Sequence, residues 1–192
     1  TGFDLLASGI IDEGIETVKT LIHMWEEKGI RKVITLCGQS QYLFTGLLKY
    51  LNLDTEIEFI SILDLAEGMK AEKAYIYGGS YFTRYAKKAD ILNNLLVNTE
   101  ETLLSSHPEF LPEVEGDKRK NIVGIWTPPL CAEYHTTGIS NMLKETIYTQ
   151  SLATIEETSF KKLIVCDPFA WKALKDHGYP EEKMEYFTDI LY

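Results

Sequence analysis

Cysteine is scarce in this sequence, and its scarcity argues against one class of protein. The chain has 192 residues and three cysteines, at positions 37, 131 and 166. An odd number of widely spaced cysteines is poor material for the disulfide framework that stabilises many small secreted domains. We therefore expect a reduced, cytoplasmic protein with an apolar core.

Basic charge and long apolar stretches are lacking too. The formal net charge is −10, and the basic cluster 118–120 lies among acidic neighbours. This balance argues against nucleic acid or an anionic membrane surface as a partner. No apolar run approaches the ~20 residues of a membrane span. No signal-peptide pattern follows Thr1, and because the chain does not begin with methionine we expect it to be a piece of a longer protein.

Two short apolar stretches, 33–37 and 163–166, each end at a cysteine and share a pattern. Both are rich in β-branched residues and are followed by a polar turn and an amphipathic segment, which is typical of a buried parallel strand followed by a helix. Cys37 and Cys166 are 129 residues apart, as are Gly9 and Gly138. This register predicts an internal duplication, with repeats at 1–66 and 67–192. The alternative is that any two helix–strand units look alike.

Apolar spacing, glycines and prolines predict alternating helices and strands. The expected helices are 12–28, 41–51, 63–69, 83–96, 139–157 and 168–176, and the expected strands are 32–37, 56–60, 73–79, 121–126, 162–166 and 184–187. Residues 99–120 are predicted to form an irregular insertion. This order predicts an α/β fold of two pseudo-symmetric repeats with parallel sheets flanked by helices. Any ligand site is then expected at the carboxyl ends of the strands.

The layout resembles that of the cysteine-rich CCG domain, which occurs in heterodisulfide reductase subunits and in the iron–sulfur subunits of anaerobic glycerol-3-phosphate dehydrogenase and glycolate oxidase. A repeat of that family has a lone cysteine after a strand, a Cys-Cys-Gly group and a Cys-x-x-Cys at a strand end. Residues 1–9 resemble the stretch that opens with Cys-Cys-Gly, with Thr1 in place of a cysteine. Residues 38–41 take the Cys-x-x-Cys place of the first repeat, one position after Cys37.

The second repeat is similarly depleted of the family's cysteines. Ser80 stands where the lone cysteine belongs, Cys131 falls in the Cys-Cys-Gly group, and residues 167–170 take the Cys-x-x-Cys place directly after Cys166. Iron–sulfur clusters normally need about four thiolates. The resemblance therefore implies a domain that has lost its cluster, has no cofactor of its own, and serves as a structural or docking module. Its partners would be other domains or subunits of a redox complex.

Two alternatives to this reading stay open. The chain is either an oxidoreductase domain that keeps a metal or a reactive cysteine, or a small-molecule binder that uses the vacated cofactor cleft. Cys131 and His135 are the one compact pair with ligand chemistry, and an iron–sulfur cluster or zinc would need Cys166 and further ligands. The competing interpretation is that His135 is an exposed loop residue and that Cys37 and Cys166 belong to the core.

For any such cleft we expect four segments to line one edge of the sheet: 37–41, 78–81, 131–135 and 166–169. The candidate binding residues are Cys37, Gln39, Ser80, Tyr81, Cys131, Tyr134, His135, Cys166 and Asp167. No Ser-His-Asp or Cys-His arrangement has a recognisable local signature, so we assign no catalytic residue. His177 precedes Gly178 at an expected helix end, where a cation favours the helix dipole.

Overall fold

The structure is a computed structural model that describes residues 1–71, 74–77, 103–106, 124–126, 140–157 and 160–192. The chain divides into two compact units, Thr1–Leu65 (unit 1) and Ala66–Tyr192 (unit 2), and each is described by itself. The boundary expected between the two repeats, after residue 66, lies beside this division. No helix in the described ranges is both long and apolar enough to cross a membrane.

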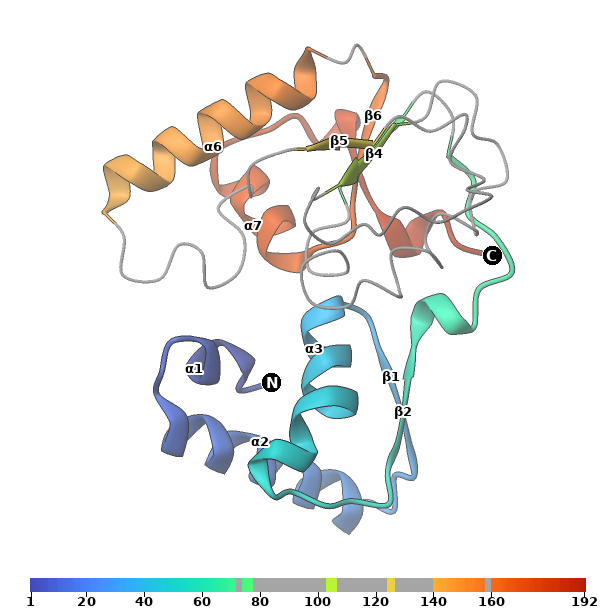
Figure 1. The fold of residues 1–192 in the computed structure, drawn as a ribbon. Coiled ribbons are helices and arrows are strands. Elements are labelled where there is room, and N and C mark those ends of the chain that lie inside the picture. The colour runs from blue at the N-terminus through green and yellow to red at the C-terminus, as the bar shows by residue number, and fades with distance from the viewer. Residues whose placement is uncertain (72–73, 78–102, 107–123, 127–139, 158–159) are drawn as a thin grey trace. The chain divides into compact units, whose positions relative to one another are not determined.

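Unit 1 contains a two-stranded parallel sheet and its helices. Its elements are α1 (Phe3–Ala7), α2 (Ile11–Glu27), β1 (Lys32–Thr35), α3 (Gly38–Tyr42) and β2 (Glu58–Ser61). A π-helical turn, Leu43–Leu47, and a 3-10 turn, Leu48–Leu51, continue α3 (Figure 1). β1 and β2 pair in parallel with Thr35 opposite Ser61, so both strands end at the same edge.

Helix α2 forms where apolar side chains recur at helical spacing. Val18 and Ile22 are buried on one face. Trp25 lies one turn further along, 5.4 Å from the ring of Phe44 and 6.0 Å from that of Phe59. Gly29 follows the helix with a φ of +70°, a backbone conformation that glycine adopts at little cost, and it ends the helix as its position predicts.

Unit 2 contains a five-stranded sheet of parallel strands in the order β5-β4-β3-β6-β7. The strands are β3 (Ala74–Tyr77), β4 (Leu103–Ser106), β5 (Gly124–Trp126), β6 (Lys162–Val165) and β7 (Met184–Tyr186). Helix α6 (Asn141–Glu156) precedes β6 and α7 (Pro168–Asp176) follows it (Figure 1). Successive strands extend in one direction from β3 to β5 and in the other from β6 to β7, so the order reverses between β3 and β6.

The core of unit 2 lies around these two central strands. All four residues of β3 are buried, as are Leu163, Ile164 and Val165 of β6, which is typical of parallel strands covered on both faces. One cluster joins this sheet to the helices and the residues after α7: Tyr75, Tyr77, Tyr148, Ile155, Leu163, Val165, Ala170, Leu174, Tyr179 and Met184. The predicted α/β class with parallel sheets is confirmed.

Several element predictions need correction. The segment 99–120 was expected to be irregular, yet it contains β4, which is held by pairing with β3 and β5 on its two sides. The helix expected at 63–69 is only a 3-10 turn, Ile62–Asp64, and Met69 instead forms an antiparallel bridge with Leu191. The helix expected from residue 41 begins three residues earlier, at Gly38. The helix expected at 83–96 lies outside the described residues.

The duplication stays a prediction, and its register needs correction. A helix, a strand, a helix and a strand follow one another in both units, as α2-β1-α3-β2 and as α6-β6-α7-β7. However, β1 begins at Lys32 and β6 at Lys162, an offset of 130 residues rather than 129. In this register Cys37 corresponds to Asp167, because each is the N-cap of the following helix. The two cysteines therefore do not occupy equivalent positions.

Candidate functional site

The chain leaves β6 through two fully buried residues, Cys166 and Asp167. The Cys166 N–H donates to the Tyr77 carbonyl oxygen at 2.9 Å, so the contact with β3 extends beyond the last residue of β6. Burial raises the pKa of the Cys166 thiol well above its usual value, and the neighbouring Asp167 carboxylate raises it further. Since the thiolate is the nucleophile and the metal ligand, Cys166 in this environment is a core residue rather than a reactive one.

Asp167 is the N-cap of α7. Its Oδ1 accepts the N–H groups of Phe169 at 2.9 Å and Ala170 at 3.0 Å. Pro168 follows at the first helical position, where its missing N–H costs nothing. The Asp-Pro pair is therefore a helix start, and its carboxylate satisfies two backbone donors that would otherwise lack a partner.

The position of this exit in the sheet is the one where parallel α/β proteins bind ligands. Such sheets form a crevice beyond the carboxyl ends of the strands where the strand order reverses. In unit 2 the order reverses between β3 and β6, which are direct neighbours with Tyr77 opposite Val165. The predicted exits after these two strands are thus adjacent. Ser80, Tyr81, Cys131, Tyr134 and His135 lie outside the described residues.

Unit 1 has its own group of polar residues at a strand end. We call Thr35, Cys37, Gln39, Ser40, Gln41 and Ser61 the β1 exit cluster. Four of them are buried although they are polar: Thr35, Gln39, Gln41 and Ser61. The Thr35 hydroxyl contacts Oε1 of Gln41 and lies 3.2 Å from the carbonyl oxygen of Ile60. Because the hydroxyl carries a single hydrogen, only one of these acceptors receives it at a time.

Two members of the β1 exit cluster retain chemistry that the fold does not use up. The Cys37 thiol is partly exposed and donates to the Ser40 hydroxyl at 3.2 Å. The buried Nε2 of Gln39 has no hydrogen-bond partner among the described residues. A buried amide without an acceptor costs about 1–3 kcal/mol. Cys37 and Gln39 were predicted as binding residues, and the structure places them two residues apart at the start of α3.

Sequence reasoning missed the rest of the β1 exit cluster. Thr35 was assigned to a strand because threonine is β-branched, and Ser61 marked only the end of the next strand. A signal was present, since a polar residue that ends an otherwise apolar parallel strand lies where ligands bind. The partner of Thr35 on α3, Gln41, was expected only as the first residue of a helix.

The predicted metal ligands are not brought together in the described part of the chain. No three His, Cys, Asp or Glu residues there form a group that could hold a metal ion. Of the expected ligands Cys131, His135 and Cys166, the structure describes only Cys166, which is buried among core residues.

No protein-family model matches this sequence, and neither a curated protein nor a solved structure matches it at a significant level.

Proposed function

We propose that the chain is a structural or docking module of a redox protein, related to the CCG domain but without an iron–sulfur cluster of its own. The observation that carries this proposal is the role of Asp167. At the place where the resemblance expects Cys-x-x-Cys, a carboxylate caps α7 by accepting two backbone N–H groups. A residue used in this way supports the helix and is not available as a cluster ligand.

The two described thiols support the same proposal. Cys166 is fully buried and protonated, and Cys37 has a serine as its neighbour three residues on. A hydroxyl is a poor substitute for the thiolates that hold such clusters. Both cysteines are free, which agrees with a cytoplasmic location for the module.

The docking role rests on an apolar face of the sheet in unit 1. Side chains alternate between the two faces of a strand, and on one side of β1 Ile34 is 48% exposed and Leu36, just after it, is 50% exposed. Parallel strands are normally covered on both faces. Exposed large apolar residues on one face of a parallel pair are typical of a contact surface. We propose that another domain or subunit of the redox complex covers this face.

Replacing Ile34 and Leu36 together by serine is expected to weaken binding to the complex by tenfold or more, because each side chain contributes about 1 kcal/mol or more when it is half buried by a partner. The measurement is the affinity for the iron–sulfur or flavin subunits that purify with the chain under anaerobic conditions.

The matched control is Met142→Ser, since Met142 is 79% exposed but lies on α6 in unit 2. It should leave the affinity unchanged. Unaltered binding of the double variant, with its fold intact by circular dichroism, would contradict the docking role.

A further inference from the structure

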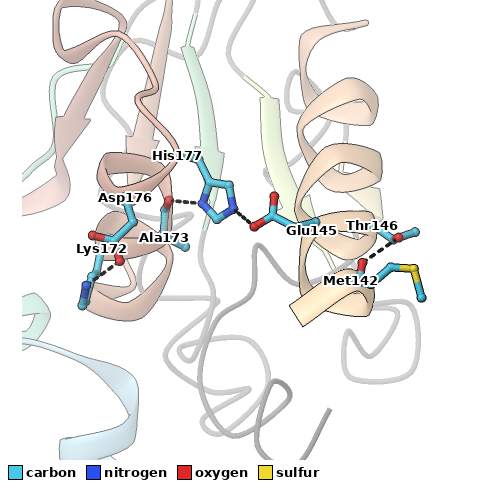
Figure 2. Close-up of polar contacts among 7 residues, drawn as sticks. All are labelled: Met142, Glu145, Thr146, Lys172, Ala173, Asp176 and His177. Atoms are coloured by element: carbon cyan, nitrogen blue, oxygen red, sulfur yellow. Dashed lines mark hydrogen bonds and ion pairs between the residues drawn. The ribbon is translucent and has the colours of Figure 1, made fainter. Parts of the chain in front are cut away.

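A histidine joins the N-terminal half of α6 to the end of α7 (Figure 2). His177 directly follows α7, and its side chain is 22% exposed. Nδ1 lies 2.7 Å from the carbonyl oxygen of Ala173, and Nε2 lies 3.0 Å from Oε1 of Glu145 on α6. The ring also stacks on Tyr148 of α6, with centroids 3.8 Å apart and an angle of 15° between the planes.

Both ring nitrogens face groups that only accept hydrogen bonds. A backbone carbonyl has no hydrogen to donate, and neither does an ionised carboxylate. A neutral imidazole has one N–H, so it bonds to either Ala173 or Glu145 and turns a lone pair toward the other. The doubly protonated ring donates to both. Its positive charge is also favoured by the end of α7 and by the face of Tyr148.

The other charged groups here do not replace this contact. Lys172 is paired with Asp176 one turn along α7, as Figure 2 shows. Lys144 precedes Glu145 on α6, and its charge opposes that of a protonated ring. Burial raises the pKa of Tyr179 to about 12, with smaller contributions from Glu156 and Tyr148, so Tyr179 is uncharged at neutral pH.

The same residues border a cavity of about 210 Å³ between the two helices. Glu145 and Lys144 line it from α6, and Lys172 and His177 line it from α7 and its end. Phe169, two residues beyond Asp167, also lines the cavity, so it extends to the start of α7. A change in the distance between the helices therefore changes the cavity directly.

We propose that His177 is a proton-dependent clamp that fixes the N-terminal half of α6 to α7 and sets the width of this cavity. Histidine is the side chain that ordinarily changes charge between pH 5 and 8. When the ring has two protons, both contacts form and the cavity is held narrow. When it loses one, the contact with Glu145 or with Ala173 is lost, and the N-terminal half of α6 separates from α7 more readily.

Hydrogen exchange of the α6 amides tests the clamp. In the wild-type protein the protection factors of residues 144–148 are expected to fall by about five- to tenfold between about pH 5.5 and pH 8. His177→Gln should show low protection at both pH values. Glu145→Gln should also remove the pH dependence, because its amide can donate to a neutral ring as well as accept from a charged one.

The matched control is His23→Gln. His23 pairs with Glu27 at 3.1 Å on the exposed surface of α2, in unit 1, and its loss should leave α6 unchanged. A second measurement needs no variant: the ring ¹⁵N signals of His177 should show two protonated nitrogens at about pH 5.5, and their titration should coincide with shifts of the Glu145 and Tyr148 amides. Equal pH profiles for the wild type and His177→Gln, or a titration of His177 without a response in α6, would overturn the proposal.

Discussion

Replacing Leu163 by alanine is expected to lower the free energy of unfolding of unit 2 by about 2–5 kcal/mol. Leu163 is fully buried in β6, between β3 and β7, and belongs to the cluster that includes Tyr75 and Leu174. Truncation removes buried methyl groups and leaves a cavity that strands paired on both sides cannot collapse to fill. The measurement is chemical denaturation, followed through the amide signals of β6 and β7 so that unit 2 is monitored separately.

The control for this prediction is Leu143→Ala on α6. Leu143 is 46% exposed, so the same chemical change should alter the free energy of unfolding by no more than about 0.5 kcal/mol. If the two alanine variants were equally stable, β6 would not be the central strand of the core of unit 2.

Replacing Asp167 by alanine is expected to destabilise unit 2 by about 2 kcal/mol, since the N–H groups of Phe169 and Ala170 lose their acceptor in a buried position. Asparagine keeps an oxygen where Oδ1 lies and is a good N-cap residue. Asp167→Asn should therefore retain more than half of the lost stability. Denaturation of the three proteins, followed as for Leu163, measures both effects.

The asparagine variant separates the two roles that Asp167 was expected to have. A residue that only caps α7 tolerates asparagine, whereas a carboxylate required for a ligand does not. A stability of Asp167→Asn as low as that of Asp167→Ala would show that the negative charge, and not the capping oxygen, is what the fold requires.

The sequence predicts the central strands and α7 well because local and long-range interactions favour the same structure there. Residues 162–166 form a continuous apolar run that suits a strand buried on both faces. Asp167 and Pro168 are strong helix-start residues, and the predicted helix 168–176 has the same bounds as α7. β4 could not be predicted in this way, because Leu103–Ser106 lacks a clear strand pattern and is held as a strand by its neighbours.

The candidate site was predicted less completely, for a different reason. The match between Cys37 and Cys166 compares residue types, while the strands and helices around them are offset by one more residue. The side chain equivalent to Cys37 is therefore the cap Asp167, and its role follows from backbone geometry that sequence similarity does not contain. The contact of His177 with Glu145 joins residues 32 positions apart, so only the packing of α6 against α7 brings it about.

The central claim is that this module resembles a CCG domain in layout and has lost the cluster. The most direct test is analysis of iron and acid-labile sulfide after anaerobic reconstitution with both, followed by removal of unbound metal. We predict a colourless protein with no more bound iron than an equally treated protein whose cysteines have been alkylated beforehand. Near-stoichiometric iron and sulfide, lost on replacement of Cys37, Cys131 or Cys166, would contradict the account.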